Sequence, residues 1–145
     1  NGIEGSLSTA IGYSIASDKI NFVLIGDLSF FYDMNALWMG AYGTNLRILL
    51  LNNSGGEIFK ALPMNLSPTA SRYVCATHHT KAEAWAKERG FRYLSAQNQT
   101  DLTAALAQFT DPNVNQTEAM FLEVFTDANQ DIADYKSYYH SLKNK

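Results

Sequence analysis

Two short stretches of sequence decide the fold: residues 20–29, Ile-Asn-Phe-Val-Leu-Ile-Gly-Asp-Leu-Ser, and residues 46–56, Leu-Arg-Ile-Leu-Leu-Leu-Asn-Asn-Ser-Gly-Gly. Each stretch begins with an apolar run of strand length and ends abruptly in glycine and polar residues. Continuous apolar runs are typical of strands that are buried on both faces, as in parallel sheets. The two stretches therefore predict two buried parallel strands, over 20–25 and 46–51, that present polar residues at their carboxyl ends.

Helical patterns alternate with strand-like runs along the rest of the chain. Helices are predicted over 6–16, 32–42, 80–88, 100–109 and 131–142, and further strands over 91–94 and 120–125. Thr80 is expected to cap the third of these helices and Gly90 to stop it. Asp33 and Asn35 are interpreted as helix caps, and residues 62–80 as irregular. Strands that alternate with helices need crossover connections, so the pattern predicts an α/β fold, a three-layer parallel sheet with helices on both faces.

The composition limits the classes of partner. The chain has 145 residues, enough for one domain over 1–145, and Lys+Arg 11 against Asp+Glu 14 gives a net charge of −3. Such a chain lacks the positive charge that binds phosphate backbones, which argues against nucleic acid. Charged residues make up 17% of the chain, below the roughly 25% of an average soluble domain. The shortage of charge predicts a face that is covered by something else.

The apolar runs, the single cysteine and the first residues of the chain suggest where the protein is located and that the chain is part of a longer one. Apolar runs fall far short of the roughly 18 residues that a membrane span needs, so no membrane span is predicted. The single cysteine, Cys75, cannot form an internal disulfide, is expected to be a small buried hydrophobe and fits a reducing cytoplasm. Because the chain opens at Asn1 without Met or a signal peptide, we expect it to be a C-terminal fragment of a longer chain.

The polar residues at the two strand ends suggest a metal-bound diphosphate. Ligands of parallel sheets bind at the carboxyl ends of the strands, where helix amino ends favour anions. The first end carries Gly26-Asp27-Leu28-Ser29 and the second carries residues 52–56, Asn-Asn-Ser-Gly-Gly. A carboxylate, an amide oxygen and backbone carbonyls are hard ligands that suit Mg²⁺. The sequence has neither a GxxxxGK[ST] loop nor a GxGxxG turn, the two commonest phosphate-binding loops.

Three separated segments of the chain resemble the diphosphate-binding domain of thiamine-diphosphate enzymes. Gly26-Asp27, followed about two dozen residues later by Asn52-Asn53, resembles the Gly-Asp to Asn-Asn motif of that family. Residues 26–37, Gly-Asp-Leu-Ser-Phe-Phe-Tyr-Asp-Met-Asn-Ala-Leu, and 52–59, Asn-Asn-Ser-Gly-Gly-Glu-Ile-Phe, are similar to its menaquinone-pathway branch, and so is the opening segment 2–10. The resemblance implies the C-terminal, thiamine-diphosphate-binding fold, truncated at its N-terminal strands.

The resemblance also implies roles for individual residues. Metal ligands for Mg²⁺ or Mn²⁺ would be Asp27, Asn53 and the carbonyl of Gly55. Residues that bind thiamine diphosphate would be Ile3 (the apolar wedge that bends it), Gly26, Asp27, Leu28, Ser29, Asn53, Gly55 and Gly56. Ile58 and Phe59 would line the substrate side, although core packing at a helix start explains an apolar pair equally well.

The implied enzyme is a transferase that decarboxylates 2-oxoglutarate and adds the succinyl unit to isochorismate. The glutamate that activates the cofactor belongs to a different domain, so no catalytic residue is expected in this chain, and the isolated chain is expected to be inactive. The implied partners are the missing N-terminal domains and a second subunit, in a homodimer or a dimer of dimers. Alternatives are an acetolactate-synthase-like or decarboxylase domain, which changes the substrate, and a non-catalytic flavodoxin-like binding module.

Overall fold

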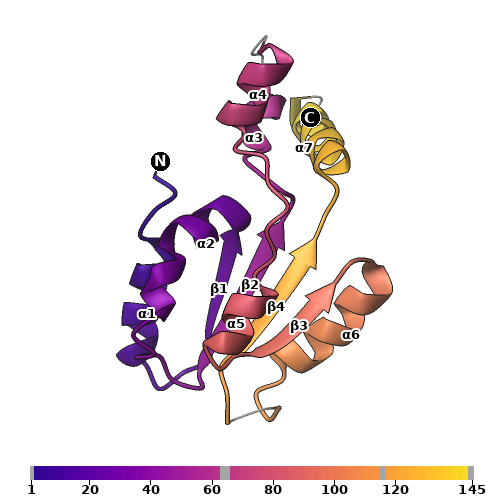
Figure 1. Ribbon diagram of the computed structural model, residues 1–145. Helices are drawn as coiled ribbons and strands as arrows, with labels where there is room; N and C mark the ends of the chain where they lie inside the picture. Colours follow the sequence, from indigo (N-terminus) through magenta and orange to yellow (C-terminus); the bar gives the residue numbers. More distant parts are fainter. Residues whose placement is uncertain (1, 63–65, 115–116, 144–145) are drawn as a thin grey trace. The chain divides into compact units, whose positions relative to one another are not determined.

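Four parallel strands form one sheet in the order β1-β2-β4-β3, with β1 (Asn21–Gly26), β2 (Leu46–Asn52), β3 (Arg92–Ala96) and β4 (Met120–Phe125). The computed structural model describes residues 2–62, 66–114 and 117–143 (Figure 1). The strands predicted at 20–25, 46–51, 91–94 and 120–125 are confirmed within two residues at each end. Most apolar side chains of the central strands β2 and β4 are buried from both faces, which is why continuous apolar runs identified these strands.

The chain divides into two compact units, which we name the sheet unit and the helical unit. The sheet unit comprises Asn1–Asn52 and Lys81–Phe125, and the helical unit comprises Asn53–Thr80 and Thr126–Lys145. Besides the strands, the sheet unit holds α1 (Ser6–Ile15), α2 (Asp27–Asp33), the 3₁₀ helix η1 (Met34–Leu37), α5 (Glu83–Glu88) and α6 (Gln99–Thr110). The helical unit holds α3 (Ile58–Ala61), α4 (Pro68–Val74) and α7 (Ala128–Lys143).

Helices cover both faces of the sheet, as predicted. On one face, buried side chains of α1, α2 and α5 pack against alternate residues of the strands, among them Phe30 of α2 and Phe121 of β4, whose rings lie 5.2 Å apart. On the other face, Ala105 and Phe109 of α6 pack against Met120 and Leu122. Alternate β4 side chains thus enter two separate cores, which is the three-layer arrangement of a parallel α/β sheet.

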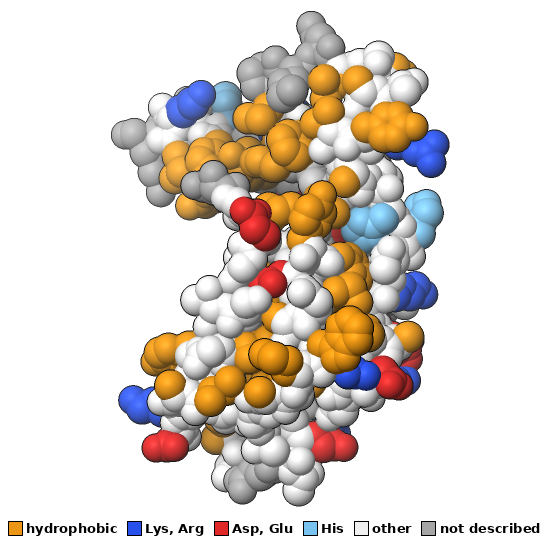
Figure 2. All heavy atoms as spheres, turned by 60° about the vertical axis from the view of Figure 1, so that its left-hand side comes forward, with side chains coloured by type: hydrophobic (Ala, Val, Ile, Leu, Met, Phe, Trp, Pro, Cys, Tyr) orange, Lys and Arg blue, Asp and Glu red, His pale blue; other side chains and the backbone are white. Residues whose placement is uncertain are grey.

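Part of the α6 face stays open to solvent over β1. Val23 and Ile25 face α1 and α2, so the intervening Phe22 and Leu24 point to the opposite face. Leu24 is 72% exposed, although the ring of Phe22 contacts Phe109 of α6. Figure 2 shows hydrophobic side chains at the surface on one side of the molecule, with charged groups sparsely distributed among them.

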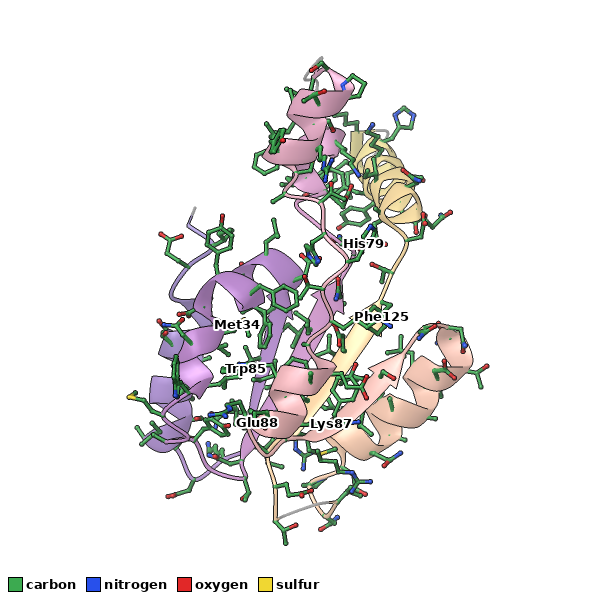
Figure 3. All side chains as sticks on the ribbon, viewed as in Figure 1. Met34, His79, Trp85, Lys87, Glu88 and Phe125 are labelled. Carbon is green, nitrogen blue, oxygen red and sulfur yellow. The ribbon has the colours of Figure 1, made fainter. Side chains whose placement is uncertain are left out.

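The helix predicted over 32–42 is placed differently in the structure. The helix begins at Asp27, directly after β1, continues as α2 to Asp33, and ends in η1 at Leu37. Gly40, whose φ is +59°, lies in the turn that follows, and such a left-handed residue interrupts a helix. The indole Nε1 of Trp85 in α5 donates to the carbonyl of Met34 at 3.2 Å and joins η1 to α5 (Figure 3).

Thr80 does not cap the third predicted helix. The helix, α5, begins at Glu83, and the N–H of the preceding residue, Ala82, donates to both carboxylate oxygens of Glu123 at 3.1 Å. The buried carboxylate of Glu123, in β4, therefore caps this helix. The sequence around Thr80 could not have predicted this cap, because Glu123 lies 41 residues further along the chain. Gly90 does stop the helix region as predicted, with a φ of +80°.

The stretch 62–80 is partly helical, contrary to the irregular structure predicted for it. Ser67 accepts from the N–H of Ala70 at 3.2 Å, and Pro68 occupies the first position of α4. Serine as N-cap followed by proline is a favoured helix start, because proline has no N–H to leave unpaired there. Residues 63–65 of this stretch lie outside the described residues.

Candidate functional site

The two strand ends that the sequence singled out are neighbours in the sheet. Gly26, the last residue of β1, pairs in register with Leu51 of β2, and Asn52 ends β2 one residue later. Asp27 follows β1 directly and Asn53 follows β2 directly. Both segments therefore start from the carboxyl edge of the parallel sheet, where the strands of α/β proteins present ligand-binding residues.

Asp27 is a buried carboxylate in the first turn of α2. The residue is 3% exposed, and its Oδ1 accepts from the N–H of Leu28 at 2.7 Å. Gly26 before it is extended, so the chain passes from strand to helix with no intervening loop. A carboxylate in this position interacts favourably with the helix dipole. For the Leu28 amide to bind a diphosphate, its N–H would have to donate to a phosphate oxygen instead of to Oδ1 of Asp27.

The loop after β2 has a backbone that demands glycine at one position. Gly55 has a φ of +151°, and a Cβ there would lie 2.7 Å from the carbonyl oxygen of Cys75. The N–H of Gly56 donates to that same carbonyl at 2.7 Å, and the N–H of His78 donates to the carbonyl of Ser54 at 3.1 Å. The loop is thus fixed to the segment that follows α4, and Cys75 is buried as predicted.

Asn53 is oriented by a carboxylate of α7. Its Nδ2 donates to Oδ2 of Asp131 at 3.3 Å, and the same Oδ2 accepts from the hydroxyl of Thr126 at 2.6 Å. Glu57, 7% exposed, lies further along the loop and is paired with Lys60 at 2.8 Å. A cavity of about 170 Å³ is lined by Asn53, Glu57, Ile58, Ala61, Asp131, Ile132 and Tyr135. Ile58 thus faces a cavity within the helical unit, whereas Phe59 is not among its lining residues.

A fully buried glutamate that sequence reasoning missed holds the end of β2. Glu123 of β4 accepts from the Nδ2 of Asn52 and from the hydroxyl of Tyr93, each at 2.7 Å, in addition to the N–H of Ala82. Burial, and then the bond to Glu123, raise the pKa of the Tyr93 phenol well above its usual range. The available signal was a single acidic residue inside the apolar run Met120–Phe125, because a charge in such a run must be paired.

The predicted site residues fall into two groups. Ile3, 37% exposed, and Gly26, Asp27, Leu28 and Ser29 belong to the sheet unit, whereas Asn53, Gly55, Gly56, Ile58 and Phe59 belong to the helical unit. The donor set Asp27, Asn53 and the Gly55 carbonyl is all oxygen, which is the chemistry that Mg²⁺ requires. The described part of the chain contains no cluster of three or more His, Cys, Asp and Glu residues suited to a metal. His79 lies in the loop after α4 (Figure 3).

Comparison with known proteins identifies one family. The family model described as "Thiamine pyrophosphate enzyme, C-terminal TPP binding domain" matches residues 2–124. Three similar curated proteins are all named 2-succinyl-5-enolpyruvyl-6-hydroxy-3-cyclohexene-1-carboxylate synthase. The protein of Bacteroides fragilis is 58% identical over 99% of this chain and 26% of its own length, and that of Phocaeicola vulgatus is 56% identical over 100% and 26%. The protein of Christiangramia forsetii is 39% identical over 87% of this chain and 22% of its own length.

The chain spans about a quarter of the length of these relatives. Among the helices of the described residues, none is both long enough and apolar enough to cross a membrane.

Proposed function

This chain belongs to the family of C-terminal TPP-binding domains of thiamine pyrophosphate enzymes, and from that membership we propose that it is the cofactor-binding domain of a 2-succinyl-5-enolpyruvyl-6-hydroxy-3-cyclohexene-1-carboxylate synthase. The proposed reaction is a transfer: 2-oxoglutarate loses CO₂, and its succinyl unit is added to isochorismate, in menaquinone biosynthesis. Relatives of that name match nearly the whole chain. We propose a cytoplasmic homodimer or dimer of dimers for the full-length protein.

The observation that carries the proposal is the pairing of Gly26 with Leu51. This register makes the two strands end together, with a buried carboxylate directly after one and an asparagine followed by a glycine loop directly after the other. We assign Asp27, Asn53 and the Gly55 carbonyl as ligands of Mg²⁺ or Mn²⁺. The backbone amides of Gly26, Leu28, Ser29 and Gly56 would hold the diphosphate.

The contribution of this chain to the reaction is to bind and position the cofactor. When bound, thiamine diphosphate supplies the electron sink for decarboxylation of a 2-oxo acid. Ile3 would contact the cofactor, and Ile58 and Phe59 would line the substrate side of the site. This assignment leaves the chain without a catalytic acid or base of its own, so residues 1–145 alone are expected to show no turnover. Turnover by these residues without the remaining domains would contradict the assignment.

The metal site is tested by calorimetry of thiamine diphosphate binding to the full-length protein, with and without Mg²⁺. Asp27→Ala and Asn53→Ala are expected to weaken the Mg²⁺-dependent affinity by about tenfold or more, since each removes a ligand. Asn129→Ala, which removes an exposed amide at the start of α7, is the matched control. Equal affinities for all proteins, with and without Mg²⁺, would rule out the proposed site.

The substrate is tested separately from the metal. The full-length protein, loaded with thiamine diphosphate and Mg²⁺, is supplied with 2-oxoglutarate or pyruvate as donor and isochorismate as acceptor, and the products are identified by mass spectrometry. Succinyl transfer from 2-oxoglutarate is the expected result. Preferential use of pyruvate would identify an acetolactate-synthase-like domain instead, and the metal-site assignment would stand.

A further inference from the structure

The proposed ligand Asn53 has a side chain with two different ends. An asparagine amide presents a carbonyl oxygen that can bind a metal and an NH₂ group that can only donate hydrogen bonds. The side chain can turn either end toward a given point. A metal site that uses asparagine therefore needs a group that holds the NH₂ end away from the metal, and groups of this kind tune metal affinity.

Asp131 is such a group. An ionised carboxylate only accepts hydrogen bonds, so it selects the Nδ2 end of Asn53, to which it lies 3.3 Å away. The carboxylate is itself fixed, because its Oδ2 also accepts from Thr126 at 2.6 Å, and its backbone N–H donates to the carbonyl of Asp127 at 2.9 Å in the first turn of α7. The other carboxylate that lines the same cavity, Glu57, is paired with Lys60.

The neighbouring asparagine has the same kind of partner. Asn52 donates its Nδ2 to Glu123 at 2.7 Å within the sheet unit. Asn52, the last residue of β2, and Asn53, which follows it, thus each donate an NH₂ group to an acidic side chain.

We propose that Asp131 is a positioning residue of the metal site, which turns the carbonyl oxygen of Asn53 toward the metal by holding its amide nitrogen. The inference rests on the proposed function, because it takes Asn53 as a ligand. Asp131 does not bind the metal; it acts only through Asn53. Its effect therefore depends on residue 53 having an amide nitrogen, and this dependence distinguishes it from a structural role in α7.

The test measures Mn²⁺ binding to the full-length protein with thiamine diphosphate, from the loss of the free-ion electron paramagnetic resonance signal. Asp131→Ala is expected to raise the half-saturating Mn²⁺ concentration by about 10-fold to 100-fold, the range for a group that orients a ligand. Asp134→Ala is the matched control, since it removes an exposed carboxylate from the same helix, three residues after Asp131, that accepts from the Nε2 of Gln130. This variant is expected to change the half-saturating Mn²⁺ concentration by no more than about twofold. Asp131→Asn retains an acceptor oxygen and is expected to restore part of the affinity.

The decisive comparison repeats Asp131→Ala in an Asn53→Asp background. Residue 53 then has no amide nitrogen to hold, and the two carboxylates repel each other, so removal of Asp131 is expected to leave the Mn²⁺ affinity unchanged or to increase it. An equal loss in both backgrounds, or equal effects of Asp131→Ala and Asp134→Ala, would overturn the inference and leave the proposed function intact. Normal Mn²⁺ binding by Asn53→Ala would overturn both. If Asp131→Ala does not fold, Asp131→Asn in the two backgrounds gives the same comparison.

Discussion

Glu123 is a carboxylate at a position where the strand pattern calls for an apolar side chain. It is 0% exposed, and its partners are the hydroxyl of Tyr93, the amide of Asn52 and the N–H of Ala82. A buried charge is tolerated only when such donors replace the lost water. Glu123 therefore links three parts of the sheet unit: β3, the end of β2 and the start of α5.

Removal of one donor tests how much this link contributes. Tyr93→Phe keeps the ring but deprives Glu123 of a hydroxyl donor, so we expect the free energy of unfolding at pH 7 to fall by about 1.5–3 kcal/mol. Urea unfolding measures this difference. Tyr13→Phe, which removes an exposed hydroxyl from α1, is expected to change stability by less than about 0.5 kcal/mol.

The same tyrosine predicts a dependence on alkaline pH. Burial and the bond to Glu123 raise the pKa of Tyr93, so above about pH 10 the unfolded chain loses a proton that the folded chain retains. Stability from this group is complete below pH 10 and declines as pH rises further. Tyr93→Phe should flatten that decline above about pH 10; parallel stability curves for the two proteins would contradict the assignment.

At the scale of elements, α1 receives its cap from a distant helix. Gly5 before α1 offers no side chain, and the N–H and hydroxyl of Ser8 both donate to the carboxylate of Asp33 at 2.7 Å. Asp33 thus ties the end of α2 to the first turn of α1, where a negative charge also favours the helix dipole. The sequence predicts Asp33 as a cap of its own helix, whereas in the structure its carboxylate caps α1, a helix that begins 27 residues earlier in the chain.

Asp33→Ala is expected to lower the free energy of unfolding by about 1–2 kcal/mol, the usual cost of a lost cap. Thermal unfolding followed by circular dichroism measures the change. Asp33→Asn keeps an acceptor and should lose less, and Asp18→Ala, an exposed carboxylate just after α1, serves as the control. A melting temperature of Asp33→Ala equal to that of Asp18→Ala would show that the contact with Ser8 contributes nothing.

The strands and the sheet were predictable because they depend on burial, which apolar runs such as 46–51 record directly. Helix starts were harder where the cap lies elsewhere in the chain: Ala82 is satisfied by Glu123, 41 residues away. The candidate ligands could be named from local motifs, since Asp27 and Asn53 follow strand ends. The carboxylate partner of Asn53 could not, because Asp131 is 78 residues distant and no local pattern relates the two.

At the scale of the whole molecule, the two units differ in how they are stabilised. The sheet unit has two apolar cores, whereas the buried residues described in the helical unit are Gly55, Glu57 and Cys75. In the helical unit, Tyr73, Tyr135 and Tyr139 expose much of their rings. Because the helical unit buries so little apolar surface, we expect its free energy of local unfolding to be low.

Hydrogen exchange followed by mass spectrometry on the 145-residue chain tests this difference. Backbone amides of α4 and α7 are expected to exchange faster than those of β2 and β4 by about 10-fold or more, which reflects local opening that does not unfold the sheet. Amides of α6, which packs on β3 and β4, provide a helical reference within the sheet unit. Equal protection of α4, α6 and α7 would contradict the prediction.

The strand order has a consequence for how the chain folds as it is synthesised. β1 and β2 are neighbours and can pair as soon as both have emerged, but β3 pairs only with β4, and β4 also pairs with β2. Once synthesised, β3 therefore stays unpaired until β4 is inserted between β2 and β3. At roughly 5–20 residues per second of synthesis, that wait lasts a few seconds. During that time β2 presents an open apolar edge, so the ribosome-bound chain is most exposed to mispairing just before β4 appears.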